Sequence, residues 1–270
     1  MNKKLWIQFV CAVVVTCAFG LTAVAQEKSL SCDDNWRNGD RVGHCVMKEQ
    51  TIAATGSLSV DGKKNGGISV KGWERREVLV RSKIQSWGNT KADAVTVAEQ
   101  ILIVTGNSNV YAEGPTNGGD QWWSVSYEIF VPRNSNLSLK AHNGGISISS
   151  VRGQIEFSTT NGGVALKGLA GNVKGTTKNG GLNVDLDGNR WDGEGLDVTT
   201  TNGGVNLRVP ENYSAHLETG TVNGGLKTEI PITVQGEIKR NLSVDLGSGG
   251  SPVKVRTTNG GVSIKRQSLK

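Results

Sequence analysis

The tripeptide Asn-Gly-Gly recurs through this chain and constrains its fold more than any other feature. Eight copies occur in 270 residues, and those that begin at Asn143, Asn161 and Asn179 are spaced 18 residues apart. A period of about 20 residues is typical of stacked architectures, in which each unit buries its apolar edge against its neighbours. The copies interpreted as structural turns begin at Asn65, Asn143, Asn161, Asn179, Asn202, Asn223 and Asn259.

Alternating apolar residues accompany nearly every copy. Pairs such as Ile146 and Ile148, or Val164 and Leu166, follow the triplet, and a period of two indicates a β-strand. A second alternating piece lies between triplets, as in residues 155–159. Each unit is therefore expected to contribute two short strands. The predicted fold class is all-β, a β-solenoid of short strands joined by Asn-Gly-Gly turns.

The triplets have the chemistry of tight turns. Asn-Gly tolerates positive φ, so at least one glycine per turn is expected there, and the second glycine lets backbones approach closely. Stacked turns are expected to align their asparagines in a ladder of amides that satisfies buried polar groups. A phosphate-binding loop is excluded, because no helix-forming segment follows any copy and no Lys has the required spacing. Asn117 starts an odd copy, interpreted as an ordinary hairpin or loop turn.

Spacing and composition divide the chain into segments of different regularity. Regular 18-residue coils begin only after Leu137, so a soft boundary is placed near Pro132. A short helix is expected at residues 91–99. The expected segments are a signal peptide (1–25), a disulfide-closed lead-in (26–50), an irregular β region (51–132) and regular β-solenoid repeats (133–270).

Several stretches resemble one known family. Besides the Asn-Gly-Gly strands, they are residues 66–73, 127–132, 210–217 and 247–264. Together they look like the bacterial putative-adhesin family of β-strand repeats, an exported domain of unknown function, and the likeness covers about residues 57–265. The resemblance implies an exported, right-handed β-helix-like fold. It implies little about mechanism, because the adhesin name rests on the fold.

The first residues have the pattern of an export signal. Two lysines precede an apolar run at residues 5–24, and Ala23-Val24-Ala25 supplies a small-residue cleavage site. The alternative is an uncleaved membrane anchor, because the run is just long enough to span a bilayer. After cleavage no stable membrane span is expected. The mature chain is expected in the periplasm, on the cell surface or outside the cell.

Cys32 and Cys45 are the only cysteines of the expected mature chain. An oxidising, exported compartment favours a disulfide between them. His44 adjoins Cys45, but two cysteines and one histidine without a C-x-x-C spacing fall short of a zinc set. No cofactor is expected.

The charge of the mature chain is small and spread out. Removing Lys3 and Lys4 from 30 basic residues leaves 28, against 24 acidic residues. Such an excess favours solubility or loose attraction to anionic envelope polymers. Nucleic acid is not an expected partner, because it would need a clustered basic face with interleaved aromatics.

The sequence lacks the common catalytic motifs. There is no G-x-S-x-G, H-E-x-x-H, G-x-x-x-x-G-K-[ST] or G-x-G-x-x-G. The three histidines, His44, His142 and His216, are expected beside strands and turns rather than as bases. Serines without a base in reach are expected to be surface residues of strands. The chain is therefore not expected to be an enzyme.

One acidic cluster is a weak candidate for a calcium site. Asp185, Asp187 and Asn189 have the one-three-five ligand spacing of a calcium loop. The sixth position is Arg190 and the twelfth is Leu196, where such a loop has Gly and Glu. A solvated loop of turn-forming residues is the simpler interpretation, and calcium binding stays open.

Tryptophans are the candidate sugar platforms. Trp122 and Trp123 are adjacent on a predicted strand, so they point to opposite faces and only one is expected in the core. The other, together with Trp191 in the acidic loop, is a candidate ring for stacking on a sugar. Trp73 and Trp87 fit this idea less well, and packing at strand edges is the alternative for all of them.

The ends of a continuous stack expose unpaired backbone groups that invite aggregation. Lys265, Arg266 and Lys270 are expected to protect the C-terminal edge, and the disulfide loop the other edge.

These observations lead to one functional hypothesis and two rivals. The favoured hypothesis is a non-catalytic envelope or surface binding module, adhesin-like, whose rigid face binds a polysaccharide or another surface protein. Thr, Ser, Asn, Gly and Lys at the outward positions favour many weak, repeated contacts. The rivals are a carbohydrate-active enzyme on a β-helix, motivated by the acidic loop with Trp191, and a periplasmic accessory of envelope-stress signalling.

Overall fold

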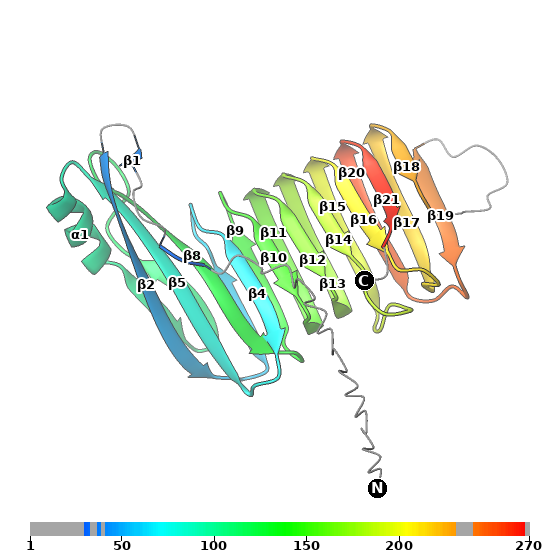
Figure 1. Ribbon diagram of the computed structural model, residues 1–270, viewed down its shortest axis with the longest axis horizontal. Helices are drawn as coiled ribbons and strands as arrows, with labels where there is room; N and C mark the ends of the chain where they lie inside the picture. Colours follow the sequence, from blue (N-terminus) through cyan, green and yellow to red (C-terminus); the bar gives the residue numbers. More distant parts are fainter. Residues whose placement is uncertain (1–29, 33–36, 39–40, 231–239, 268–270) are drawn as a thin grey trace, which may run out of the picture.

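The computed structural model describes residues 30–32, 37–38, 41–230 and 240–267, and the expected signal peptide lies outside them. The described chain is mostly β, with two long sheets and one helix, α1 (Lys91–Glu99), at the position expected from the sequence (Figure 1). Within these ranges no helix has the length and apolar character needed to cross a bilayer.

The first sheet, sheet A, runs the length of the molecule. Its outer strand near the N-terminus is β1, and its outer strand at the other end is β18. In spatial order its strands are β1 (Arg37–Asn38), β2 (Arg41–Ala53), β5 (Glu77–Gly88), β8 (Trp122–Pro132), β4 (Ile68–Trp73), β10 (Ile146–Ser149), β12 (Val164–Lys167), β14 (Leu182–Asp185), β16 (Val205–Val209), β21 (Val262–Arg266) and β18 (Leu226–Thr228).

The second sheet, sheet B, supplies the other strand of every coil. It ends on β19 and on β6. In spatial order its strands are β19 (Asn241–Leu246), β17 (Ala215–Asn223), β20 (Pro252–Asn259), β15 (Gly195–Asn202), β13 (Ala170–Asn179), β11 (Arg152–Asn161), β9 (Asn136–Ala141), β3 (Ser57–Asp61), β7 (Asn109–Glu113) and β6 (Leu102–Gly106).

Equivalent residues of successive coils stack in register. Ile146 pairs with Val164, Val164 with Leu182, and Leu182 with Val205, all between parallel strands. All four side chains are buried, because alternate residues of a strand point to opposite faces and these face the interior between the sheets. The result is a solenoid-like stack in which each coil contributes two short strands, as the alternation predicted (Figure 1).

The end of the molecule near the N-terminus is built differently. Strands β2, β5 and β8 are long and pair antiparallel. Helix α1 packs against β5 and β2 with Ala94, Val97 and Ala98 buried, so it closes this end of the core. Its first turn has a capping box, in which Thr90 accepts from Asp93 N–H and the Asp93 carboxylate accepts from Thr90 N–H.

The last coil of the chain does not lie at the end of the stack. Strand β20 lies between β15 and β17, and β21 lies between β16 and β18. The expectation that Lys265 and Arg266 protect an exposed edge is therefore wrong, because β21 has a parallel neighbour on each side. The edges here are β18, three residues long, and β19, which pairs antiparallel with β17. Lys270 lies outside the described residues.

In the triplets at Asn161 and Asn179 the first glycine is required by close packing rather than by its φ angle. Gly162 and Gly180 do not have positive φ, so the expectation of one such glycine per turn is wrong for these coils. A Cβ on Gly162 would lie 2.1 Å from the carbonyl oxygen of Gly144, and a Cβ on Gly180 would lie 2.1 Å from that of Gly162. Any side chain would thus collide with the backbone of the preceding coil.

Candidate functional site

The asparagines of the seven triplets form one continuous ladder along the stack. The side-chain amide of Asn161 donates to Asn143 Oδ1 at 2.8 Å, and that of Asn179 donates to Asn161 Oδ1 at 2.8 Å. Six such bonds connect, in spatial order, Asn65, Asn143, Asn161, Asn179, Asn202, Asn259 and Asn223. Most of these side chains are exposed, so the ladder lies on the surface and does not satisfy buried groups as expected.

Buried threonines make a second, internal ladder. Thr159 Oγ1 donates to the carbonyl of Gly144, and Thr177 Oγ1 to that of Gly162, each at 2.8 Å. Thr200 and Thr257 repeat the contact with the triplet glycine of a neighbouring coil. Neighbouring corners are therefore connected by an exposed amide bond, and the corners at Gly144, Gly162, Gly180 and Gly203 also accept a buried hydroxyl bond.

Asn117 stands apart from the ladder. Its side chain binds both backbone groups of Trp123, accepting from the N–H at 2.6 Å and donating to the carbonyl at 3.0 Å. Gly118 and Gln121 form an antiparallel bridge beside it. This is the local turn that the residues after Asn117 indicated.

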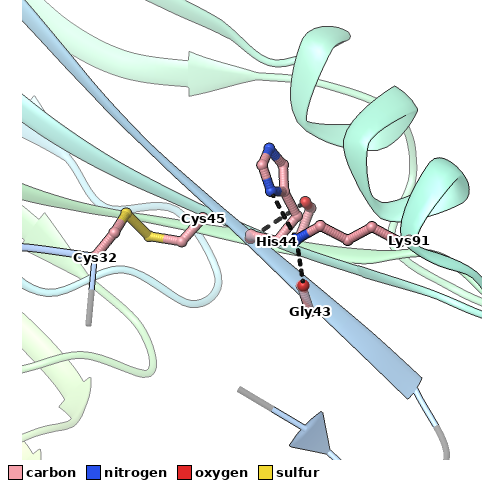
Figure 2. Close-up of a disulfide and its surroundings, with 6 residues drawn as sticks. Cys32, Gly43, His44, Cys45 and Lys91 are labelled. Carbon is pink, nitrogen blue, oxygen red and sulfur yellow. Dashed lines mark hydrogen bonds between the residues drawn. A yellow bond between two sulfur atoms is a disulfide. The ribbon is translucent and has the colours of Figure 1, made fainter. Parts of the chain in front are cut away.

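Cys32 and Cys45 are joined by a disulfide with a Cα–Cα distance of 5.7 Å (Figure 2). His44 points to the other face of β2, toward α1, where Lys91 Nζ lies 3.2 Å from its Nδ1. Burial and the Lys91 charge lower the pKa of His44, which favours a neutral ring. Among the described residues, no three His, Cys, Asp or Glu side chains are grouped so as to hold a metal ion.

Polar groups of the acidic loop form hydrogen bonds and an ion pair within the protein. Asp185 accepts from Arg208 of the next coil at 2.8 Å, and the backbone carbonyl of Asn189 accepts from Ser214 N–H at 2.8 Å. The Asp187 carboxylate accepts from the backbone N–H of Gly188. One of the three candidate ligands, Asp185, is thus already paired with a cationic side chain of the protein.

Trp191 belongs to the core, so its ring is not exposed for stacking on a sugar. Its side chain is only 5% exposed, and its Nε1 donates to the carbonyl of Gly171 at 3.0 Å. Trp73 packs on Phe130 with ring centroids 5.4 Å apart. Trp122 and Trp123 are both half-buried, and only Trp123 packs against the core.

His216 takes part in a surface network that its sequence position did not reveal. The antiparallel register of β17 and β19 places it opposite Asp245, whose Oδ1 lies 2.7 Å from His216 Nδ1. Its Nε2 lies 3.3 Å from Ser243 Oγ and 3.7 Å from Glu218, which Lys254 binds at 2.9 Å. The hydrogen bond from Lys254 holds the pKa of Glu218 below its usual value. The Lys254–Glu218 ion pair and the contacts of His216 with Asp245 and Ser243 thus connect β20, β17 and β19 at the surface.

A groove of about 740 Å³ crosses the outer face of sheet B near the corner of the coils. We call it the lysine–threonine groove. It spans four neighbouring strands, β3, β9, β11 and β13, and reaches the end of β15. Its polar lining consists of Asp61, Lys63, Lys64, Lys140, His142, Ser158, Thr159, Thr160, Thr176, Thr177, Lys178 and Thr201.

Strand register explains why these residues meet. Lys140 pairs with Ser158, and Ser158 with Thr176, so these three side chains form one row across the sheet. Two residues further along each strand, His142, Thr160, Lys178 and Thr201 form a parallel second row. Neighbouring strands lie about 4.8 Å apart, so each row offers polar groups at a regular spacing.

The groove carries an excess of positive charge. Lys63 lies 3.5 Å from Asp61, the one acidic residue of the lining, and over the ring of Tyr111 at 4.6 Å. Lys64, Lys140 and Lys178 are exposed and make no ion pair within the described part of the chain. Three lysine charges are thus available to a ligand.

The sequence carries a signal for this groove in its repeat spacing. Lys140, Ser158 and Thr176 are separated by 18 residues, the same spacing as the triplets. Aligning the coils on their asparagines would have placed these outward side chains side by side. Lys63 and Lys64 could not be found in that way, because the coil that contains them is separated from the next by 78 residues between Asn65 and Asn143.

Comparison with solved structures gives distant likenesses. A putative cell adhesion protein from Clostridium sporogenes is 13% identical, with a TM-score of 0.43, over 83% of this chain and 100% of that one. A putative adhesin from Bacteroides fragilis is 10% identical, with a TM-score of 0.33, over 83% and 97%. A putative lipid binding protein from Parabacteroides distasonis is 8% identical, with a TM-score of 0.27, over 83% and 97%.

No curated protein matches the sequence. A family model described as Toastrack DUF4097, a domain of unknown function, matches residues 48–265, which run from within β2 to within β21. The chain therefore belongs to the Toastrack DUF4097 family.

Proposed function

We propose that this protein is a non-catalytic, exported binding module of the cell envelope that holds an acidic polysaccharide in the lysine–threonine groove. The observation that carries the proposal is the groove itself, in which unpaired lysines lie among threonine and serine hydroxyls on the outer face of a parallel sheet. Lysine charges attract carboxylates, and hydroxyls exchange hydrogen bonds with sugar hydroxyls.

The repeat geometry suits a polymer better than a small molecule. Neighbouring coils bring lysine, serine or threonine side chains to equivalent places, at intervals of about 4.8 Å. A chain of sugars lying across the coils would therefore make several equivalent weak contacts, and simultaneous contacts raise the total affinity well above that of one. A small ligand would use only a part of the groove.

The lining argues for binding rather than turnover. Hydrolysis of a glycosidic bond commonly uses two carboxyl groups on either side of it. Asp61 is the one acidic residue of the groove, and Lys63 lies beside it. The rival idea of an enzyme centred on the acidic loop loses its aromatic platform, because Trp191 is buried.

The proposed location follows from the disulfide. A bond between Cys32 and Cys45 persists in an oxidising compartment and is rare in a reducing one. An exported protein would meet the acidic polymers of the envelope or of neighbouring surfaces. The precise location, periplasmic or external, does not alter the chemistry of the groove.

The proposal is tested by retention on acidic polysaccharides in native affinity electrophoresis. We expect polygalacturonate or alginate in the gel to slow the mature protein, and neutral dextran to leave its mobility unchanged. The double substitution Lys140→Glu and Lys178→Glu should abolish the retardation, because it reverses two of the three unpaired charges. Raising the salt concentration should weaken it.

The matched control is the double substitution Lys167→Glu and Lys265→Glu, an equal change of charge at two exposed positions of sheet A, away from the groove. It should leave retention close to that of the natural protein. Equal loss in the control and in the groove variant would mean that net charge alone attracts the polymer. Shortening of the polysaccharide during incubation would overturn the non-catalytic part of the proposal.

A further inference from the structure

A second cavity, of about 490 Å³, adjoins the groove at Lys63 and Lys64. We call it the junction cavity, because it lies where the antiparallel end of the molecule meets the first coils. Its walls come from the loop after β3, from the end of β7 in sheet B and the loop that follows it, and from β8 in sheet A. Its volume is within the range of about 300–1,000 Å³ that is usual for small-molecule sites.

Tyr127 contributes an unused polar group to this cavity. Along β8 it alternates with outward-facing residues, so its side chain enters the interior, where it is 2% exposed. It lines the junction cavity together with Gly62 and Ala112 of the opposite sheet. Its hydroxyl has no hydrogen-bond partner among the described residues, and a buried polar group without a partner costs about 1–3 kcal/mol.

Burial, and to a smaller extent the charge of Asp61, raise the pKa of Tyr127 well above its ordinary value. The hydroxyl therefore stays protonated and can donate a hydrogen bond throughout the physiological pH range.

The remaining walls are rigid and of mixed chemistry. Trp123 is half-buried, and its Nε1 donates to the carbonyl of Pro115 at 2.6 Å. Asn117 binds its backbone on both sides, so the indole is fixed in place. A Cβ on Gly114 would lie only 3.0 Å from the indole ring, which shows how closely the loop packs on it. Lys64 brings an unpaired positive charge to the lining, in which Lys63 and the exposed Glu113 are the other charged side chains.

We propose that the junction cavity binds the terminal uronic-acid unit of the acidic polysaccharide that occupies the neighbouring groove. This inference rests on the proposed function for the polymer, but the site has its own residues. The sugar carboxylate would pair with Lys64, the apolar face of the ring would lie on Trp123, and a sugar hydroxyl would accept from Tyr127 Oη. The groove then holds the chain, and the cavity recognises its end.

The test measures binding of monomeric galacturonate and glucuronate by saturation-transfer NMR and by titration of chemical shifts. We expect millimolar binding that weakens about five- to tenfold in Tyr127→Phe, the loss of one hydrogen bond. The unfolding midpoint of this variant should stay the same or rise, since the substitution removes a buried hydroxyl without a partner. Tyr111→Phe is the matched control, because Tyr111 lies under Lys63 but does not line the cavity.

The outcomes separate the two proposals. The cavity proposal is supported if Tyr127→Phe weakens the binding of monomers and the double substitution Lys140→Glu and Lys178→Glu leaves that binding unchanged. This holds whether or not the polymer is retained. Equal affinity in the natural protein and in Tyr127→Phe overturns it, because the ligand then gains nothing from the hydroxyl. Failure of both uronic acids to bind also overturns it, while retention of the polymer would leave the groove intact.

Discussion

The stacked coils and the antiparallel end of this molecule enclose one core in two different ways. In the stack, four-residue strands such as β10, β12 and β14 pair only with the coil before and the coil after. In the antiparallel end, β2, β5 and β8 have 13, 12 and 11 residues, and a helix takes the place of the next coil.

The difference shows that contacts repeated from coil to coil can stabilise strands that are short. A four-residue strand in isolation makes few contacts, but each coil repeats the same apolar pairs, the same amide bond and the same buried hydroxyl bond at its neighbour. Stability in such an array is close to a sum of equal contributions at each interface. The antiparallel end depends instead on long ladders, on α1 and on the disulfide.

The largest effect is expected from a side chain at the first glycine of a triplet. Gly162→Val or Gly180→Val places a Cβ 2.1 Å from a backbone carbonyl of the preceding coil, so two coils must separate. We expect a loss of about 4 kcal/mol or more in the free energy of unfolding. Urea denaturation followed by circular dichroism measures it. Gly118→Val is the control, because no atom lies within 4 Å of that position, and three equal small losses would show that the coils are not closely stacked.

Loss of the disulfide should affect the antiparallel end alone. Replacing Cys32 and Cys45 by Ser removes a crosslink across 13 residues, for which the loop-entropy model gives about 3 kcal/mol. Hydrogen exchange should show faster opening of β2, and little change in β12 and β14. Intact-mass measurement of the unreduced natural protein provides the companion observation. Two free thiols there, or equal loss of protection in both regions, would contradict the prediction.

The asparagine ladder is expected to matter more than a single local turn. Asn161→Ala removes bonds to both Asn143 and Asn179, and Asn117→Ala removes two bonds to the backbone of Trp123. Because the ladder is exposed, we expect about 1 kcal/mol for Asn161. Hydrogen exchange should place that loss in the neighbouring coils, while the Asn117 change stays in its loop. Confinement of the Asn161 effect to a single strand would argue against coupling between coils.

The smallest effect is expected at the acidic loop. Arg208→Ala breaks the ion pair with Asp185 on the outer face of sheet A, where both side chains reach solvent. Exposed pairs contribute about 0–1 kcal/mol, so the melting temperature should fall by a few degrees at most. Added calcium should leave the melting temperature of the natural protein unchanged. A calcium-dependent rise in melting temperature that disappears in Asp187→Ala would restore the loop as a metal site.

The local sequence pattern alone determined where the strands and turns of each coil lie and which side chains are buried. The two-residue alternation at Ile146, Val164 and Leu182 identified strands and their buried face, because successive side chains of a strand must point to opposite sides. The 18-residue spacing placed equivalent asparagines at equivalent corners, and the ladder follows from that spacing. The residues after Asn117 likewise marked it as the exception.

Only the tertiary structure decided which strands are neighbours across long separations. Strand β20 enters between β15 and β17, a choice that leaves no local trace, because any parallel strand with the same alternation could pair there. The burial of Trp191, the contact of His216 with Asp245 and the meeting of Lys63 and Lys64 with Lys140 all depend on such choices. Periodicity sets the face of the strand to which a side chain points. The residues that surround that side chain are instead set by the free energy of packing between distant segments.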